Sequence, residues 1–257
     1  MNELIKTKIA AAFTVHAWGD ILAFANNIVC RLPMRELVLS LHGVGEPHHW
    51  VGGEELPYWI SVRSFTRLLD EALELPKGSE LKIIFTFDDG NASDALVALP
   101  ELSKRGLRAS FFVCAGRIGK EHYLDDSMIK DLLEGGMSIG THGMHHRNWR
   151  ILDAKALEEE VVEARRKLED IIQRPVTTVA IPFGSYDRRV INRLMRDPWE
   201  CVYTSDRGKA RSSAKIKPRE TVDATMQDEY LLRALSATPS LRVRMQRELT
   251  CFYKRLR

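Results

Sequence analysis

An apolar run that ends in two adjacent carboxylates constrains this chain more than any other feature. Residues 81–87 read LKIIFTF, a β-branched and aromatic pattern that predicts a buried strand, and Asp88, Asp89 and Gly90 come directly after it. A strand cannot bury two unpaired carboxylates, so they need a metal, a cation or water. Asp-Gly is also a common turn pair, so without further evidence a strand followed by a simple acidic turn would be the better interpretation. Because ligands sit at the C-terminal ends of strands in α/β folds, the downstream residues decide between the two.

Length, charge and cysteine content limit the classes of protein. The 257 residues suffice for one large domain or two small ones, and a net charge of +3 is too small to indicate a nucleic-acid partner. No Cys-x-x-Cys pair occurs, so we expect free thiols rather than a zinc knuckle or a disulfide framework. The four cysteines are Cys30, Cys114, Cys201 and Cys251.

The N-terminal segment bears on localisation. Lys6 and Lys8 precede the short apolar run 9–15, which faintly resembles a signal peptide, but His16 and Asp20 interrupt the stretch after it. We interpret this segment as an amphipathic helix and expect a cytoplasmic protein. No apolar run reaches the ~18 residues of a transmembrane helix.

Strands and helices alternate along the rest of the chain with short links, which favours one α/β domain built as a parallel barrel. Ser61 and Asp153 are expected helix N-caps. The predicted strands cover 36–42, 81–87, 109–114, 137–141, 176–181, 201–204 and 214–217, and the polar stretch 206–213 is expected to be a loop. The predicted helices cover 1–33, 62–74, 92–105, 126–134, 153–173, 188–196 and 227–257. The domain boundaries we expect are a helical extension over 1–35, a barrel over 36–225 and a C-terminal helical segment over 226–257 packed on the barrel.

Four predicted strand ends carry the unusual polar or turn residues, and the strand ends on one face of a barrel converge. Two imidazoles and one carboxylate make an open divalent-metal site suited to zinc, and also to iron, cobalt or nickel. A second carboxylate beside it can act as general base. The four strand ends carry His42; Asp88 with Asp89; His142 with His145 and His146; and Pro182, Phe183 and Gly184.

Each of these pieces also has a purely structural interpretation. A histidine-rich loop is often only polar, Pro-Phe-Gly is a common turn, and His42 could be a core histidine with satisfied hydrogen bonds. Their joint occurrence at strand ends, in this order, favours a catalytic site.

The residues 86–90 (TFDDG), the spacing His142-x-x-x-His146 and the triplet 182–184 (PFG) resemble the polysaccharide deacetylase family, the NodB-homology domain of carbohydrate esterase family four. The resemblance covers residues 36–222. It implies a distorted (β/α) barrel, here with extra N- and C-terminal helices, and metal-dependent removal of acetyl groups from carbohydrate, usually from N-acetylated hexosamine units.

The resemblance also implies roles for the motif residues. Asp89, His142 and His146 would hold the metal, Asp88 would be the general base, and the backbone N–H near Phe183, between Pro182 and Gly184, would bind the oxyanion. His145 stays ambiguous, because it could ligate metal or point into solvent.

Two departures from the family pattern affect these roles. The arginine that often precedes the Pro-Phe-Gly triplet is replaced by Ala180 and Ile181, and Arg219 is a candidate substitute. The family's late histidine, its general acid, is missing because no histidine follows His146. His42 ends an apolar strand at the front of the chain, as in circularly permuted members resembling poly-N-acetylglucosamine deacetylases, so we expect it to be the acid.

Two alternatives remain open: hydrolysis of another C–N bond, such as a cyclic amide or imide, and a non-catalytic carbohydrate-binding or regulatory domain. The expected partner is an acetylated carbohydrate. The basic C-terminal stretch indicates either a helix that packs its apolar residues on the barrel or weak contact with an anionic membrane surface, and the first is favoured. Those apolar residues are Leu241, Met245, Leu249 and Phe252.

Overall fold

The computed structural model describes residues 35–49, 51–76, 81–225 and 240–256. The expected helical extension over 1–35 therefore lies outside the described residues, apart from Arg35, which begins the first strand. Residues 35–257 form one compact unit.

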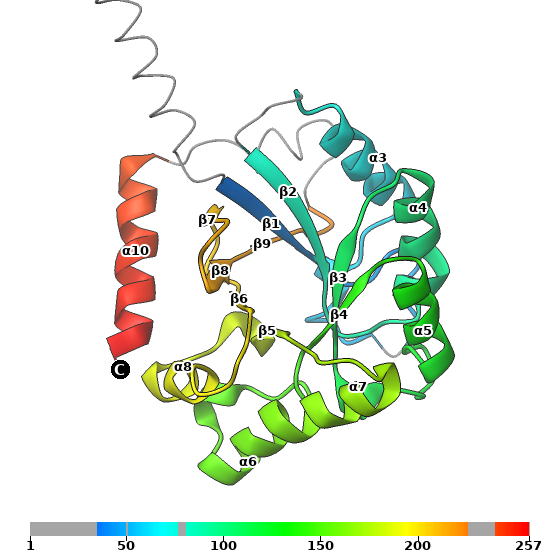
Figure 1. The fold of residues 1–257 in the computed structure, drawn as a ribbon. Helices are drawn as coiled ribbons and strands as arrows, with labels where there is room; N and C mark the ends of the chain where they lie inside the picture. Colours follow the sequence, from blue (N-terminus) through cyan, green and yellow to red (C-terminus); the bar gives the residue numbers. More distant parts are fainter. Residues whose placement is uncertain (1–34, 50, 77–80, 226–239, 257) are drawn as a thin grey trace, which may run out of the picture. The chain divides into compact units, whose positions relative to one another are not determined.

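In the described residues, nine strands form a single sheet that curves into a barrel (Figure 1). The sheet order is β7-β1-β2-β3-β4-β5-β6-β8, and β9 also pairs with β1. Every pairing is parallel except that of β1 with β7. The strands are β1 (Arg35–Leu41), β2 (Leu81–Phe87), β3 (Ala109–Val113), β4 (Ser138–Thr141), β5 (Thr178–Ala180), β6 (Cys201–Thr204), β7 (Ala210–Arg211), β8 (Ile216–Pro218) and β9 (Glu220–Thr221).

The segment that contains β8 and β9 closes the ring of strands. Strand β8 pairs with β6, and β9 pairs with β1, with Arg219 alone between them. The backbone N–H of Arg219 donates to Thr204 O at 2.9 Å, and its side chain is fully buried. Arg219 is thus held by a backbone hydrogen bond at the seam of the barrel, the point between β8 and β9 where the ring of strands closes.

Helices cover the outside of the sheet (Figure 1). A π-helical turn at Asp94–Ala98 leads into α4, and another at Glu159–Glu163 joins α6 to α7, so the helix predicted over 153–173 is continuous. The predicted N-caps Ser61 and Asp153 are confirmed, since their side chains accept from Ser64 N and Ala156 N. The helices are α3 (Val62–Leu73), α4 (Leu99–Lys104), α5 (Asp126–Glu134), α6 (Ala154–Glu158), α7 (Ala164–Ile172), α8 (Arg188–Leu194) and α10 (Leu241–Leu256). Short 3-10 turns lie at Leu56–Tyr58, Ala115–Arg117, Trp149–Ile151 and Pro182–Gly184.

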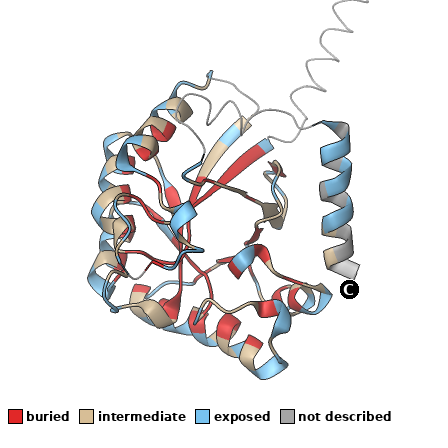
Figure 2. Ribbon diagram, turned by 180° about the vertical axis from the view of Figure 1, so that it is seen from behind, coloured by how far each residue is buried: buried red, intermediate tan, exposed pale blue. Residues whose placement is uncertain are grey.

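The hydrophobic core lies inside the barrel and between the barrel and its helices, where Figure 2 shows the buried residues. Phe87 stacks on Phe111 at 4.7 Å between ring centroids and meets Phe65 edge-on at 5.8 Å. These rings anchor α3 and β2 to each other, so the chain immediately after Phe87 is held in place.

The C-terminal helix departs from the sequence prediction. Met245 and Leu249 were expected to pack on the barrel, but their exposed fractions are 55% and 64%, and Figure 2 shows α10 as largely exposed. For these two residues the prediction is wrong. The described contact between the helix and the barrel is polar: Lys254 Nζ donates to Asp206 Oδ1 at 2.6 Å and to Gly184 O at 3.2 Å. The short strands β7 and β9 were also not predicted, and β7 lies within the stretch expected to be a loop.

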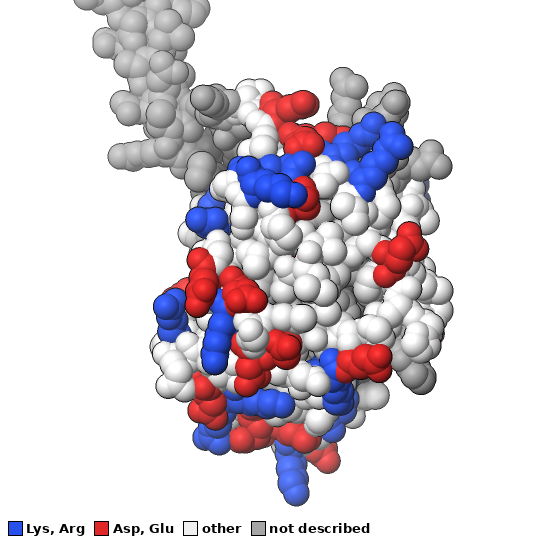
Figure 3. Space-filling view, turned by 90° about the vertical axis from the view of Figure 1, so that its right-hand side faces the viewer, with Lys and Arg blue, Asp and Glu red and all other residues white. Residues whose placement is uncertain are grey.

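Charges of both signs are interspersed on the face that Figure 3 presents, around a broad area without charged side chains. That face therefore offers no extended positive field of the kind nucleic acids require. Among the helices of the described residues, none has the length and apolar character needed to cross a membrane.

Candidate active site

The two carboxylates at the end of β2 lie inside the barrel. Asp88 and Asp89 are 3% and 5% exposed. The chain turns sharply here, with Asp89 at φ 76° and Gly90 at φ 73°. A Cβ at Gly90 would lie 2.9 Å from Val113 Cγ1, so glycine suits this turn both in conformation and in space. The turn allows both carboxylates to serve one site.

Asp88 is held by a guanidinium from the seam of the barrel. Arg219 donates from Nη1 to Asp88 Oδ1 and from Nη2 to Oδ2, each at 2.7 Å, and Ser40 Oγ donates to Oδ2 at 3.1 Å. Burial by itself would raise the pKa of Asp88, but the charge of Arg219 outweighs it and holds the pKa well below its ordinary range. Asp88 is therefore ionised at any working pH.

Asp89 and two histidines bring their ligand atoms together. His146 Nε2 lies 3.3 Å and His142 Nε2 lies 3.9 Å from Asp89 Oδ1, and all three atoms lie within 4.8 Å of one another. Tetrahedral zinc ligands at ~2.0–2.2 Å from the ion are about 3.3–3.6 Å apart, close to these separations. Asp89 Oδ1 is buried and has no hydrogen-bond partner, so the donor set and the unsatisfied oxygen both fit a divalent metal.

The tautomer of His142 also fits a metal ligand. Its Nδ1 lies 2.9 Å from Ala180 O, so Nδ1 carries the proton and the Nε2 lone pair faces Asp89. Burial lowers the pKa of His142 to about 4, although the neighbouring carboxylate of Asp88 opposes the shift. The imidazole is thus neutral at physiological pH, as metal binding requires.

A buried glutamate orders the loop that carries the histidines. Glu160 is fully buried and accepts hydrogen bonds from Met144 N, His145 N, Arg147 Nε and Trp149 Nε1. No sequence pattern singled this residue out, because it reads as part of an acidic helix surface. The available signal was its position one residue before Val161, on the side of the helix that carries the apolar residues.

His145, which the sequence left ambiguous, lies away from the metal-ligand cluster. Its Nε2 is 3.3 Å from Glu159 Oε1, and its side chain is 48% exposed. The three-residue cluster of Asp89, His142 and His146 does not include it.

The Pro-Phe-Gly turn stands over the histidines. Phe183 has φ 57°, a left-handed conformation that is costly for an aromatic residue, and its ring centroid lies 4.4 Å from that of His146. Its backbone N–H donates to no protein acceptor in the described part of the chain. The Gly184 N–H, in contrast, is already bonded to Ile181 O. The free donor of this turn therefore belongs to Phe183.

Left-handed backbone recurs at the site, since Asp89, His146 and Phe183 all have positive φ. Such conformations persist where the surroundings impose them, and they cluster at functional sites.

His42 immediately follows β1, beside the end of β2, where Asp88 N donates to Leu41 O. Its Nδ1 is buried without a hydrogen-bond partner, and its ring centroid lies 5.0 Å from that of Tyr58. Its charge is one of those that act on the carboxylates of Asp88 and Asp89. Its role as general acid stays a prediction.

Arg117 is a site residue that no sequence motif singled out. Its Nη1 lies 3.4 Å from Asp89 Oδ1 and its guanidinium stacks on Tyr123 at 5.0 Å. A second cation therefore borders the metal-ligand cluster.

The fold and the site together define a (β/α)-barrel protein whose strand ends carry a carboxylate–imidazole cluster fitted to a divalent metal. The family model for polysaccharide deacetylase matches residues 76–201, the part of the barrel that runs from the segment before β2 to the start of β6. The resemblance seen in the motifs is thereby confirmed.

Individual relatives agree. The Bacillus subtilis (strain 168) protein YxkH, provisionally named a polysaccharide deacetylase, is 25% identical over 134 residues. The match covers 52% of this chain and 48% of YxkH, so this chain spans about half the length of that relative.

Solved structures share the fold. BC0361, a polysaccharide deacetylase from Bacillus cereus, superimposes with a TM-score of 0.67 at 20% identity, covering 79% of this chain and 69% of that one. IcaB from Ammonifex degensii gives 0.62 at 21% identity, covering 78% and 95%. At these identities the likeness establishes the fold, and the predicted distorted (β/α) barrel of the deacetylase type is confirmed.

Proposed function

We propose that this chain is a metal-dependent hydrolase that removes acetyl groups from a carbohydrate, with N-acetylated hexosamine units as the substrate class. The observation that carries the proposal is that the carboxylates of two adjacent residues have different surroundings. Asp89 has an unsatisfied buried oxygen facing two imidazoles, and Asp88 is neutralised by Arg219. One carboxylate is free to hold a metal, while the other is an ionised, paired base that can accept a proton only from an acidic donor.

Asp89, His142 and His146 would hold the ion, with zinc as the first candidate and cobalt, nickel or iron as others. When bound, such an ion polarises a carbonyl and makes a water more acidic. The paired Asp88 is a weak base, so it can accept a proton only from an acidified donor.

The proposed proton movements use three groups of this site. Asp88 accepts the proton of the water whose oxygen adds to the acetyl carbonyl, and the N–H of Phe183 donates to the resulting oxyanion. His42 donates a proton to the sugar nitrogen as the C–N bond breaks, because an amine anion is a poor leaving group. The products are acetate and the free amine.

The non-catalytic alternative had its main support in the missing motif arginine. The guanidinium of Arg219, from the link between β8 and β9, binds Asp88 instead, which weakens that support. Hydrolysis of a cyclic amide uses the same residues, so only substrates distinguish it.

The experiment is acetate release from a panel of N- and O-acetylated oligosaccharides, with cyclic amides and imides in parallel. Metal-stripped protein is assayed before and after addition of zinc, cobalt, nickel or iron. We expect acetate release that depends on added metal and no turnover of the cyclic compounds. The proposal is contradicted if only the cyclic amides are turned over. It is also contradicted if the metal-bound protein turns over no substrate at all.

A further inference from the structure

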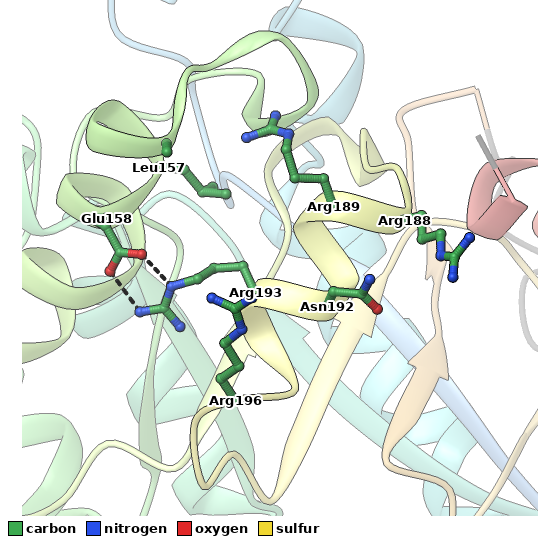
Figure 4. Close-up of a pocket in the computed structure, with 8 residues that line it drawn as sticks. Leu157, Glu158, Arg188, Arg189, Asn192, Arg193 and Arg196 are labelled. Carbon is green, nitrogen blue, oxygen red and sulfur yellow. Dashed lines mark hydrogen bonds and ion pairs between the residues drawn. The ribbon is translucent and has the colours of Figure 1, made fainter.

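A surface pocket of about 460 Å³ lies between α6 and α8, on the helical outside of the barrel (Figure 4). Its lining includes four arginines and one glutamate. These residues are Arg188, Arg189, Arg193, Arg196 and Glu158, with Leu157 beside them.

Arg193 is fully engaged within the protein. Its Nε and Nη2 donate to the two carboxylate oxygens of Glu158, as Figure 4 shows, and its Nη1 donates to Asp197 Oδ2 at 2.9 Å. The carboxylates of Glu158 and Asp197 are therefore both used by a single arginine.

The other arginines have donors to spare. Arg189 uses Nη2 to hold Trp149 O at 3.2 Å and Arg150 O at 3.1 Å, while its Nε is 4.0 Å from Asp187. The guanidinium of Arg196 makes no hydrogen bond or close ion pair with any residue that the structure describes, although its charge acts on Glu158 nearby, and it is exposed. In Figure 4 it points toward Arg193, whereas the guanidinium groups of Arg188 and Arg189 point away from these two.

The result is an excess of positive charge in a concave space. Guanidinium groups that face one another repel, and a bound oxyanion would relieve the repulsion and supply acceptors for the free donors. Planar guanidinium groups match carboxylate and phosphate oxygens in pairs.

The pocket is connected to the candidate active site through the chain. Helix α6 follows the loop that carries His146, and α8 follows the turn that carries Phe183. Arg189 binds carbonyls in the Trp149–Ile151 turn, three to four residues after His146. A ligand held here would therefore lie beside the segments that shape the site.

We propose that the pocket between α6 and α8 is a binding site for an oxyanion, carried either by free phosphate or by an acidic saccharide, with Arg196 as its free donor beside Arg193. This site is separate from the proposed metal cluster, so anion binding can be measured whether or not the chain proves to be a deacetylase.

The test uses the full chain and isothermal titration with two probes, inorganic phosphate and glucuronic acid. Glucose is the neutral control, and chloride holds the ionic strength constant. Arg196→Gln removes the free guanidinium, and Glu158→Gln removes the carboxylate that engages Arg193. Arg63→Gln, at an exposed arginine of α3 on another part of the barrel, is the matched control.

We expect saturable binding of at least one anion and none of glucose. Arg196→Gln should weaken binding about two- to fivefold, Glu158→Gln should strengthen it by a similar factor, and Arg63→Gln should leave it unchanged. Binding of phosphate alone identifies a free-phosphate site, and binding of glucuronate identifies an acidic-sugar site. The proposal fails if neither anion binds, or if Arg196→Gln and Arg63→Gln behave alike.

Discussion

Arg219 and Asp88 form a buried two-pronged ion pair that joins the closing segment of the barrel to the end of β2, with both N–O distances at 2.7 Å. Arg219 also donates to Thr86 Oγ1 at 3.1 Å and lies over the Phe112 ring at 5.5 Å. The pair has two consequences: it keeps Asp88 ionised, and it fastens the seam of the barrel.

Arg219→Gln should therefore destabilise the protein by about 3–5 kcal/mol, because it leaves an uncompensated buried carboxylate. Chemical denaturation measures the effect. The double variant Asp88→Asn/Arg219→Gln should recover much of the loss, since neither charge remains. Arg166→Gln, which breaks an exposed ion pair with Glu163, is the control and should have a much smaller effect. Equal losses in the single and double variants would show that the pair is not the cause.

His42→Ala tests the general acid. The variant should retain metal and fold but lose about 10²–10⁴-fold in rate. Metal content and rate are measured on the same sample. A variant with near wild-type turnover would remove His42 from that role.

Glu160→Gln should disturb the histidine loop. An amide cannot accept from all the donors that now surround the carboxylate, so we expect a loss of about 2–3 kcal/mol in the free energy of unfolding and weaker metal binding. Glu159→Gln, next to it and half exposed, is the matched control and should retain metal affinity. Unchanged metal affinity in Glu160→Gln would show that the loop is ordered by other contacts.

The pH dependence of stability follows from His142. Its pKa is about 4 in the folded protein against an ordinary 6.5, so between these values the unfolded chain binds more protons. The free energy of unfolding of metal-free protein should therefore fall as pH drops from about 6.5 to about 4, by roughly 3 kcal/mol at most from this residue.

Denaturant titrations across that range measure the slope. His142→Gln should reduce it and leave the part that comes from His146, whose pKa burial also lowers, while His145→Gln, which removes a half-exposed imidazole from the same loop, should keep it. A wild-type slope in His142→Gln would refute the assignment.

Sequence patterns predicted the parts of the site that depend on strand ends. Asp89, His142 and His146 come together because parallel strands deliver their C-terminal ends to one face of the barrel. Arg219 was a candidate substitute for the missing motif arginine because its neighbours read as a late strand. In the structure, β8 and β9 pair on either side of it, and its side chain is buried against Asp88.

Other features depend on tertiary contacts that no local pattern reveals. Glu160 reads as one of three consecutive glutamates, and only the packed helix shows which one is buried. The left-handed backbone of Phe183 and the two-residue strands β7 and β9 are set by their neighbours. The apolar residues of α10 follow a helical period, yet Met245 and Leu249 are exposed, because periodicity does not specify whether a partner surface is present.

The most direct test of the central claim measures zinc stoichiometry and acetate release together in the wild type, Asp88→Asn and Asp89→Asn. Asp89 and Asp88 are adjacent, similarly buried carboxylates, so each variant is the other's control. The account predicts that the wild type binds one zinc and releases acetate, that Asp88→Asn binds zinc without releasing acetate, and that Asp89→Asn loses zinc. A wild type that releases acetate at the same rate in excess chelator, or an Asp88→Asn variant that turns over normally, would contradict it.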